Sequence, residues 1–293
     1  MAETWTIGRL LTWTKEYLEK QGSGSPRLDA EVLLAHCKQC PRIALYTAFD
    51  EIAADDLRNK FREFVKKRAD GMPVAYLVGK REFYSLNFAV TPAVLIPRPE
   101  TEFLVVRALD LLKESTASGV AHPEVVDVGT GSGCIAVTVA KHSPTVQVTA
   151  IDQSPAALDI AKKNADAHKV IDRITFAEGD LLGAFDSEPR WNLILSNPPY
   201  ISEPEYAELD KTVRDFEPRA ALVGGPAGTE LIERLLPQVA AQLLPGGTFL
   251  CEISPMIVAT VEKLVAKHPT LDWQPPIKDI AQLPRVIEVR KVR

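Results

Sequence analysis

The chain has 293 residues, of which 46% are hydrophobic and 25% are charged, fractions typical of a soluble globular protein and unlike those of a disordered or fibrous chain. The 34 Lys and Arg side chains against 39 Asp and Glu give a net charge of −5, which argues against a protein whose main task is gripping phosphate backbones. At roughly 100–200 residues per domain, the length allows one large domain together with a small one.

The N-terminal sequence MAETWTIGRLL has no basic region followed by an apolar one, so no secretory signal is expected. Charged residues, prolines or glycines interrupt every apolar stretch before it reaches the roughly 18–20 residues that span a membrane. Four cysteines are too few to crosslink a chain of this length, so free thiols in a reducing environment are expected. The sequence therefore predicts a cytoplasmic protein without membrane contact.

Residues 1–75 carry 12 basic and 11 acidic side chains and predict a small all-helical domain. Hydrophobic residues recur at helical spacing in residues 7–18, 28–34 and 55–65, and glycine, serine and proline interrupt the pattern between them. The basic run at residues 58–68 is interpreted as the solvated face of an amphipathic helix, with RNA contact as the alternative.

Cys37 and Cys40 form a C-x-x-C pair, as found in redox sites and in half of a zinc site. No second cysteine or histidine pair follows at zinc-finger spacing, and the surrounding sequence LDAEVLLAHCKQC is typical of the end of an amphipathic helix. The favoured interpretation is a pair of semi-buried thiols at a helix end, and no metal site is predicted.

The rest of the sequence predicts a β-hairpin linker followed by an α/β domain. Residues 76–98 carry a charge of +2, and their alternating aromatic and polar residues around Ser85 are typical of a hairpin. Residues 99–293 carry 19 basic and 27 acidic side chains, and from residue 124 strands alternate with helices. This alternation predicts βαβ units in a mostly parallel, doubly wound sheet. Helices are expected at residues 133–141, 155–168, 229–244 and 255–268, and strands at 125–128, 146–151, 174–177, 191–196 and 248–252, with two more strands at the end.

A glycine-rich turn joins the first of these strands to its helix, in the sequence Asp-Val-Gly-Thr-Gly-Ser-Gly at residues 127–133. Glycines allow a tight turn and let the backbone approach a ligand closely. The G-x-G-x-G spacing differs from the G-x-G-x-x-G of pyrophosphate-binding proteins, and the lysine of a P-loop is missing. An uncharged adenosine ligand needs no pyrophosphate cradle. The turn therefore predicts a site for such a ligand, formed by Gly129, Thr130, Gly131, Ser132 and Gly133.

Acidic residues follow near the ends of the next two strands. Asp152 lies 23 residues after Gly129, where a carboxylate can accept hydrogen bonds from both ribose hydroxyls of an adenosine group. The alternative role for Asp152 is the N-cap of the following helix. Asp180 and Leu181 are expected at the same edge of the sheet, beside the adenine. The order and spacing of these residues favour S-adenosylmethionine as the cofactor.

The motif Asn197-Pro198-Pro199-Tyr200 directly follows the strand WNLILS. Two prolines force the chain out of the sheet at the carboxyl edge of this strand, beside the glycine turn. The Asn197 side-chain oxygen and the Pro198 carbonyl can then accept both hydrogens of a planar NH2 group, and Tyr200 can stack on its face. Such a group is a weak nucleophile, and two acceptors that orient it and stabilise its developing positive charge favour methyl transfer without a strong base. We predict that all four residues bind the substrate and that Asn197, Pro198 and Tyr200 are catalytic.

With these motifs in view, the chain resembles the HemK/PrmC family of peptide chain release factor glutamine methyltransferases over nearly its whole length. The resemblance rests on the sequences LDAEVLLAH, PVAYLVGKREFYSLNFAV, VLIPRPETE, DVGTGSG, NPPYI and FEPRAAL. NPPY alone is shared with methyltransferases that act on the amino groups of adenine, cytosine and guanine. PRPETE followed by DVGTGSG and FEPRAAL is far more specific to this family.

The resemblance implies an N-terminal helical, substrate-recognition domain at residues 1–75, a β-hairpin linker at 76–98 and a Rossmann-like, seven-stranded methyltransferase domain at 99–293. It implies that the release factor is a protein substrate, whose Gly-Gly-Gln loop places its glutamine on residues 197–200. The implied products are N5-methylglutamine and S-adenosylhomocysteine. A monomer is expected, because the encounter with a release factor needs no dimer.

The resemblance also assigns cofactor contacts to the glycine turn, Asp152, Leu181 and Asn197. One segment departs from the family's pattern, which usually has an acidic Asp-Gly-Leu after the glycine pair. This chain has Gly224-Gly-Pro-Ala-Gly-Thr-Glu230 instead, and Pro226 stiffens that loop. Four charged residues have two open roles, internal pairing or a place at the rim of the active site: Arg98, Glu100, Glu102 and Glu217.

Two other functions compete with release factor methylation. A nucleic-acid amino-methyltransferase uses the same NPPY chemistry, but it predicts a basic surface and a base-recognition insertion. The charge of −8 on residues 99–293 and the lack of a large insertion count against it, so no specific nucleic-acid binding is expected. A cofactor-binding module without catalysis has no need for the amide clamp at residues 197–200.

Overall fold

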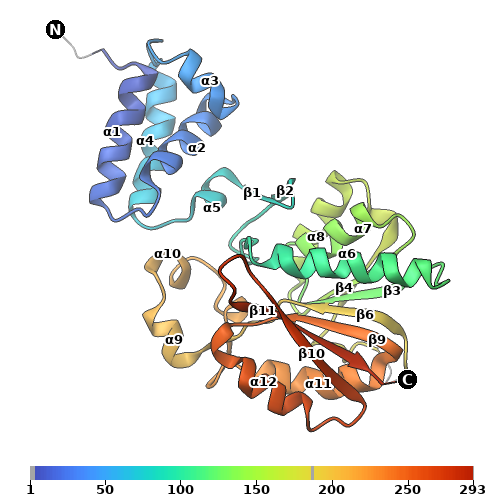
Figure 1. Cartoon of the computed structure of the whole chain (residues 1–293). Coiled ribbons are helices and arrows are strands. Elements are labelled where there is room, and N and C mark those ends of the chain that lie inside the picture. Colours follow the sequence, from blue (N-terminus) through green and yellow to red (C-terminus); the bar gives the residue numbers. More distant parts are fainter. Residues whose placement is uncertain (1–3, 186–187, 293) are drawn as a thin grey trace. The chain divides into compact units, whose positions relative to one another are not determined.

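The computed structural model describes residues 4–185 and 188–292 and divides into two compact units (Figure 1). The first unit, called here the helical unit, comprises Met1–Gly79 and Asp210–Phe216. The second, called the sheet unit, comprises Lys80–Leu209 and Glu217–Arg293. No helix in the described part of the chain is both long and apolar enough to cross a membrane.

The helical unit confirms the helices expected from hydrophobic spacing. Apolar side chains from several helices form one core, which includes Ile7, Leu33 and Phe61. The Thr6 hydroxyl accepts a hydrogen bond from the Arg9 amide and so caps the first helix. The helices described in the N-terminal part of this unit are α1 (Ile7–Lys20), α2 (Pro26–Lys38), α3 (Arg42–Thr47), α4 (Asp55–Ala69) and α5 (Val74–Val78).

The C-x-x-C cysteines lie at the end of α2, as expected. Cys37 is buried in the last turn of the helix, Cys40 follows the helix, and both are free thiols. Burial raises the pKa of the Cys37 thiol to about 11, so it stays protonated at neutral pH. Both features are typical of a structural thiol rather than a reactive one.

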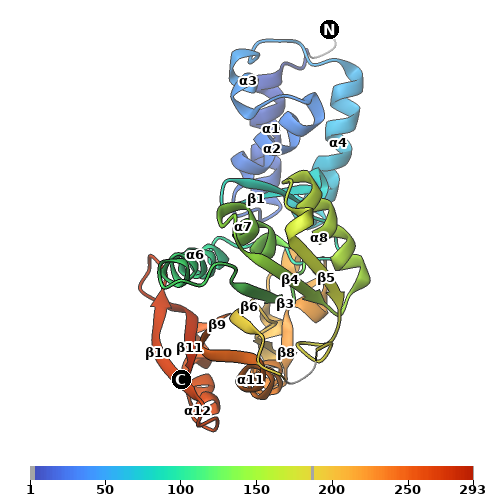
Figure 2. The same ribbon diagram turned by 90° about the vertical axis from the view of Figure 1, so that its right-hand side faces the viewer.

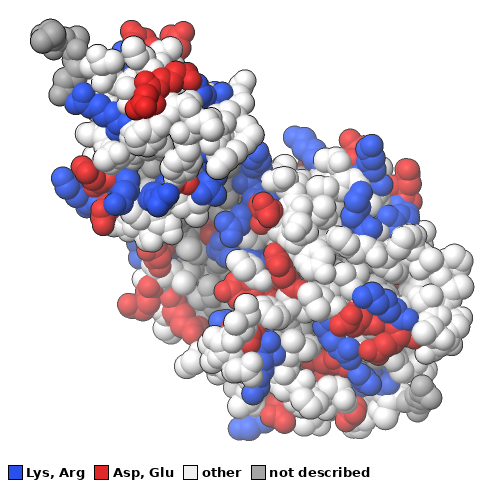
Figure 3. All heavy atoms as spheres, turned by 45° about the horizontal axis from the view of Figure 1, so that its top comes forward, with Lys and Arg blue, Asp and Glu red and all other residues white. Residues whose placement is uncertain are grey.

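The basic run lies on α4, mostly on its solvent side. Lys60, Arg62, Lys66 and Lys67 are exposed, as the solvated-face interpretation predicts. Arg68 differs, because its Nε donates to Asp29 Oδ2 at 2.7 Å inside the helical unit. In Figure 3 acidic side chains lie mainly toward the upper end of the visible surface of this unit, and basic side chains form a row along its lower edge with a few acidic ones among them.

A short segment from the second half of the chain belongs to the helical unit. Residues 210–216 contain α10 (Lys211–Arg214), and the Phe216 ring packs against Gly71, where an added Cβ would lie 3.2 Å from the ring. The chain therefore leaves the sheet unit after Leu209 and returns to it at Glu217. The sequence patterns did not predict this excursion.

A seven-stranded sheet forms the centre of the sheet unit, in the order β10-β11-β9-β6-β3-β4-β5 (Figure 1). The strands from β9 to β5 run parallel to one another, and β11 pairs antiparallel with both β9 and β10. The prediction of a mostly parallel, doubly wound sheet is confirmed. The strands are β3 (Glu124–Val128), β4 (Gln147–Asp152), β5 (Ile174–Glu178), β6 (Trp191–Ser196), β9 (Leu243–Glu252), β10 (Leu271–Lys278) and β11 (Pro284–Lys291).

Helices cover both faces of the sheet, because its strands are apolar on both sides. Figures 1 and 2 show α6 (Thr101–Ala117), α7 (Cys134–His142) and α8 (Pro155–Ala167) on one face, and α11 (Glu230–Gln242) and α12 (Val258–Val265) on the other. Two separate clusters of buried side chains correspond to these two layers. The helix expected at residues 255–268 is shorter in the structure, since residues 255–257 form a 3₁₀ turn, η3.

The predicted hairpin is present as β1 (Lys80–Phe83) and β2 (Leu86–Ala89). Tyr84 and Ser85 form its two-residue turn with φ of 49° and 59°, the left-handed backbone that such turns require. Phe83 and Phe88 are buried in the core on the α6 side of the sheet.

Short elements near the carboxyl edge of the sheet were not expected from the sequence. The pair β7 (Ile201–Ser202) and β8 (Val223–Gly225) forms a separate two-stranded sheet. Two more short elements are α9 (Glu203–Glu208) and η2 (Arg219–Ala221). At the other edge, η1 (Ile171–Arg173) directly precedes β5.

Asn164 on α8 crosslinks the hairpin to the glycine turn, and we predict that Asn164→Ala destabilises the sheet unit. Its side chain bonds both the amide and the carbonyl of Ala89, at 2.7 and 3.0 Å, and the carbonyl of Ser132 at 2.8 Å. Truncation should lower the free energy of unfolding by about 1–3 kcal/mol for each buried group left unpaired, and accelerate amide exchange at Ala89. Urea denaturation followed by circular dichroism measures the first effect. The exposed neighbour Lys163→Ala is the control, and equal stability of the two variants would contradict the prediction.

Candidate active site

A cavity of about 430 Å³ lies at the carboxyl edge of the sheet. The strand order reverses there, since β4 and β5 extend from one side of β3 while β6 and β9 lie on the other. In open α/β sheets such a reversal opens a crevice where ligands bind. Of the residues predicted to form a site, ten line this cavity: Gly129, Thr130, Gly131, Ser132, Asp152, Asp180, Leu181, Asn197, Pro198 and Pro199.

The glycine turn follows β3 with a backbone that suits glycine. Gly129, Gly131 and Gly133 have φ of 74°, 55° and 77°, in the left-handed region. A Cβ on Gly129 would meet no atom within 4 Å, so this backbone faces open space. A Cβ on Gly133 would lie 3.0 Å from the Cβ of Ala161, so this glycine allows α7 to pack on α8 and does not line the cavity.

Asp127 supports the turn through hydrogen bonds from its buried side chain, a role that the sequence pattern did not predict. The carboxyl is fully buried, and its Oδ2 accepts bonds from the Thr130 hydroxyl at 2.6 Å and the Ala136 amide at 3.2 Å. Burial raises the pKa of Asp127 to about 7, although these two hydrogen bonds oppose the shift. Because the Thr130 hydroxyl already donates to Asp127, Thr130 is available to a ligand in the cavity through its backbone.

Asp152 ends β4 at the cavity wall and orders the two loops around it. One carboxyl oxygen accepts from the Gly131 amide and the other from the Ser154 amide, each at 2.9 Å. Ser154 itself caps α8 through a bond from the Ala157 amide, so the alternative role of Asp152 as the N-cap is wrong. An ionised carboxylate accepts about four hydrogen bonds, which leaves lone pairs on Asp152 for ligand hydroxyls.

Asp180 and Leu181 lie on the same side of the cavity, after β5. Leu181 is buried at the cavity wall and adopts φ of 56°, a backbone conformation that is uncommon for residues other than glycine. Asp180 is exposed and forms an ion pair with Arg234 of α11, which also lines the cavity.

Asn197 continues directly from β6, on the other side of the glycine turn. The Ser196 hydroxyl donates to the Val128 carbonyl at 2.8 Å and thus ties the end of β6 to the end of β3. The Asn197 Nδ2 group donates to the Thr101 hydroxyl at 3.1 Å. This bond uses the NH2 end of the amide and leaves Oδ1, an acceptor, for a ligand.

Tyr200 has a different environment from the three residues before it. It packs against the core on the α11 side of the sheet, and its hydroxyl donates to Glu252 Oε1 at 3.2 Å. Burial, followed by the nearby Glu252 carboxyl, raises the pKa of the Tyr200 hydroxyl above its usual value. Tyr200 is not among the residues that line the cavity.

The glycines of the segment 224–230 hold the backbone of the Asn197–Tyr200 motif. A Cβ on Gly224 would lie 2.3 Å from the Pro199 carbonyl oxygen, and one on Gly228 would lie 2.4 Å from that of Tyr200. β7 and β8 pair directly beside them. Pro226 is exposed between these two glycines, in the loop that departs from the family's pattern. The sequence pattern does not predict the contact of these glycines with the motif.

The charged residues with two open roles mostly pair internally. Glu217 is buried, accepts from the Ile96 amide at 3.1 Å and forms an ion pair with Arg98. Arg98 also lines the cavity, so it has both of the roles that were open for it. Glu102 accepts from the Tyr84 amide at 2.9 Å and thereby ties α6 to the hairpin. Glu100 is the N-cap residue of α6 but makes no side-chain cap bond.

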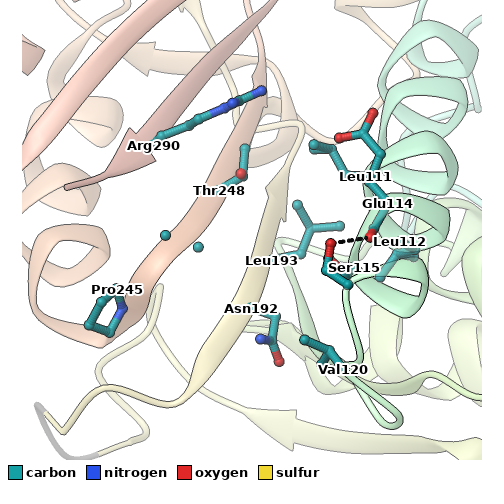
Figure 4. Close-up of a pocket in the computed structure, with 13 residues that line it drawn as sticks. Leu111, Leu112, Glu114, Ser115, Val120, Asn192, Leu193, Pro245, Thr248 and Arg290 are labelled. Carbon is teal, nitrogen blue, oxygen red and sulfur yellow. Dashed lines mark hydrogen bonds between the residues drawn. The ribbon is translucent and has the colours of Figure 1, made fainter. Parts of the chain in front are cut away.

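A second cavity, of about 300 Å³, lies elsewhere in the sheet unit, between α6 and the strands β6 and β9 (Figure 4). It contains none of the predicted site residues, and its arginine, Arg290, is paired with Glu288. The part of the chain that the structure describes contains no group of three or more His, Cys, Asp or Glu arranged to hold a metal ion. The carboxyl-edge cavity is therefore the candidate active site.

Comparison with known proteins identifies related sequences over the whole chain. Residues 9–79 match the family described as PrmC N-terminal domain, and residues 107–216 match the methyltransferase small domain. A release factor glutamine methyltransferase of Rhodopirellula baltica is 49% identical, covering 99% of this chain and 100% of that protein. One of Koribacter versatilis is 41% identical, covering 94% and 95%.

Solved structures show the same fold at low sequence identity. The hMettl16 catalytic domain in complex with the MAT2A 3′UTR hairpin 1 has a TM-score of 0.54 at 14% identity, covering 72% of this chain and 76% of that one. A methyltransferase from Pyrococcus furiosus has a TM-score of 0.51 at 15% identity, covering 72% and 91%.

Gly224→Ala should disturb the backbone of the Asn197–Tyr200 motif, because the new Cβ would overlap the Pro199 carbonyl. We expect a loss of about 1–3 kcal/mol in the free energy of unfolding. We also expect faster hydrogen exchange of the Ile201 amide, which donates to the Leu222 carbonyl at 3.0 Å. Gly24→Ala is the control, since a Cβ there meets open space. A variant with unchanged Ile201 exchange would refute the proposed contact.

Proposed function

This chain belongs to the release factor glutamine methyltransferase family, and we propose that it methylates the side-chain amide nitrogen of the glutamine in the Gly-Gly-Gln motif of peptide chain release factors. The product is N5-methylglutamine. The observation that carries this proposal is that Asn197, Pro198 and Pro199 line the same cavity as the glycine turn and Asp152. An amide clamp and an adenosine site thus share one space.

The residues around the cavity suit S-adenosylmethionine, which supplies the electrophilic methyl group when bound. The open space at Gly129 lets a ligand approach the backbone of the turn. Asp152 is held in place by the Gly131 and Ser154 amides and retains lone pairs for the ribose hydroxyls. Leu181 and Asp180 complete the proposed adenosine side of the site. We propose Gly133 as a support of the turn, since its Cβ position packs on Ala161.

The clamp orients a group that is a poor nucleophile. The lone pair of an amide nitrogen is delocalised, so the nitrogen gains positive charge as the methyl group arrives. In the proposed arrangement Asn197 Oδ1 and the Pro198 carbonyl accept the two N–H groups, align the nitrogen and stabilise that charge. Two consecutive prolines restrict the backbone that carries these acceptors. Tyr200 is the last residue of the motif. The proton becomes acidic only during transfer, so no strong base is needed.

The helical unit is proposed to recognise the release factor, and the enzyme is proposed to act as a cytoplasmic monomer. Residues 9–79 match the N-terminal domain of this family, which supports a dedicated role for the unit. Methylation of nucleic-acid amino groups is the competing function. The charge of −8 on residues 99–293 disfavours it, because such enzymes hold their substrates through phosphate contacts.

Incubation with labelled S-adenosylmethionine should transfer label to a recombinant release factor. We expect mass spectrometry to locate the methyl group on the glutamine of the Gly-Gly-Gln peptide. A release factor with this glutamine replaced by alanine is the matched control and should stay unlabelled. Total RNA and DNA are included as competing substrates, and label found in nucleic acid alone would overturn the proposal.

Asn197→Ala and Asp152→Ala should separate turnover from cofactor binding. Loss of Asn197 removes a substrate acceptor and should lower kcat far more than it weakens cofactor binding. Loss of Asp152 should weaken cofactor binding by about 1–3 kcal/mol, the scale of hydrogen bonds to a charged group. Isothermal titration and steady-state kinetics measure the two effects.

Two control variants match these substitutions. Asn192→Ala changes a residue of β6, the strand that Asn197 follows, whose side chain accepts from the Glu124 amide, and Asp159→Ala changes an exposed aspartate on α8. Neither control should change kcat or cofactor affinity. An Asn197 variant that loses both equally would show that the clamp is misassigned, and an Asp152 variant with unchanged affinity would refute its ribose role.

A further inference from the structure

Glu252 is a buried acid behind the wall of the candidate active site. It is the last residue of β9. Because Ser196 of β6 pairs with Cys251 of β9, the residues that follow them, Asn197 and Glu252, lie next to each other. The residue is 1% exposed and does not line the cavity. Its Oε2 atom is buried without a hydrogen-bond partner among residues 4–185 and 188–292. Burying a carboxyl group lowers the stability of the fold, so its presence at this place suggests a functional role.

Glu252 is connected to both ends of the Asn197–Tyr200 motif. The Tyr200 hydroxyl donates to its Oε1 at 3.2 Å. On the other side, the Thr101 hydroxyl accepts from Asn197 Nδ2 at 3.1 Å, and the same hydroxyl acts on the Glu252 carboxyl, whose pKa it lowers. Thr101 is itself buried in the first turn of α6, and it is among the residues that line the cavity.

We propose that Glu252 is the positioning residue of the substrate clamp, and that it fixes Asn197 through Thr101 and Tyr200 directly. The inference rests on the proposed function, because it assigns a role in the same reaction. Glu252 touches neither the cavity nor a reacting atom, so it acts through its neighbours and is not a catalytic residue.

The direction of each hydrogen bond explains why an acid is needed. A hydroxyl that accepts a bond from Asn197 still has its own proton to donate, and Tyr200 also donates. The Tyr200 hydroxyl donates to Glu252, and in the proposed arrangement the Thr101 hydroxyl gives its proton to the same carboxyl, because an ionised carboxylate is a group that only accepts. With Thr101 held as an acceptor toward Asn197, the asparagine amide keeps its NH2 end inward and its Oδ1 toward the substrate. A flipped amide would present a donor to the substrate NH2 and lose the clamp.

The charge state of Glu252 should therefore affect turnover. Burial raises its pKa to about 7, the hydrogen bonds from Thr101 and Tyr200 oppose this shift, Glu100 adds to it, and Arg285 opposes it. Burial raises the pKa of the Cys251 and Cys134 thiols and the Glu252 charge adds to this shift, so both thiols stay protonated at neutral pH. When Glu252 is protonated it loses its negative charge, so the hydrogen bonds that it accepts weaken and the clamp loosens.

The test compares wild-type enzyme with Glu252→Gln, which keeps the shape and replaces one acceptor oxygen with an NH2 group. Methylation of a release factor is measured from pH 6 to pH 8.5 at saturating substrates, with cofactor affinity measured by titration. We expect wild-type kcat to rise about tenfold from pH 6 to pH 8, as the titration of one group near pH 7 requires. The variant should be about 10- to 100-fold slower at pH 8 and nearly independent of pH, with cofactor affinity within about twofold of wild type.

Two further variants distinguish positioning from general stability. Glu288→Gln is the matched control, because Glu288 is a buried glutamate on the adjacent strand β11 that pairs with Arg107 and Arg290 away from the site. It should keep the wild-type pH profile and kcat. Thr101→Val should slow turnover about tenfold, and the double variant with Glu252→Gln should be no slower than the Glu252→Gln single variant, since both act through one network.

The outcomes separate the two proposals. An inactive wild-type enzyme would overturn the proposed function, whatever the variants do. An active wild-type enzyme with an unchanged Glu252→Gln variant would overturn the role of Glu252 alone. A Glu252→Gln variant that loses cofactor affinity, or additive effects in the double variant, would also contradict the positioning role. Lower kcat at unchanged affinity, with loss of the pH step, supports it.

Discussion

The parallel register of β3, β6 and β9 is the constraint on which the candidate active site depends. Val128 pairs with Ser196, and Ser196 pairs with Cys251, so the three strands end side by side. The residues that come next on each strand are Gly129 and Asn197, and Glu252 ends the third. A shift of one residue in either pairing would move these groups to different depths and turn their side chains to the opposite face. The bond from the Ser196 hydroxyl to the Val128 carbonyl holds the register where it matters.

Two buried acids, Asp127 and Glu252, support the two halves of the site. Each has one oxygen without a hydrogen-bond partner in the described part of the chain, and burial raises the pKa of each to about 7. The folded state therefore binds protons that the unfolded chain has released above about pH 4, and stability falls as the pH rises from there toward 7. At a pH where both carboxylates carry charge, the site therefore lowers the free energy of unfolding. Such a cost is typical of groups retained for function.

Much of the fold could be predicted because its signals are local. The alternation of apolar strands and helices, the hairpin turn and the glycine turn each lie within about 20 residues, and each is present in the structure. The support of the clamp depends instead on long-range contacts, such as Thr101 with Asn197 and Gly224 with Pro199. No spacing rule identifies partners that lie 25 or 96 residues apart. Glu252 did leave a signal, since a lone acid at the end of the apolar strand TFLCE marks the carboxyl edge of the sheet.

The separation of orientation from proton transfer follows from the chemistry of an amide. A strong base in the cavity would compete for the N–H groups that the clamp must hold, whereas an acid behind the wall can order the clamp without reaching the substrate. Glu252 is excluded from the cavity, and its two hydroxyl neighbours, Thr101 and Tyr200, stand between it and the rest of the motif. In this proposal the charge of Glu252 determines the direction of the hydrogen bonds around it, and these bonds orient the side chains of the clamp. The prolines limit the motion of the backbone, and the acid limits the rotation of the side chains.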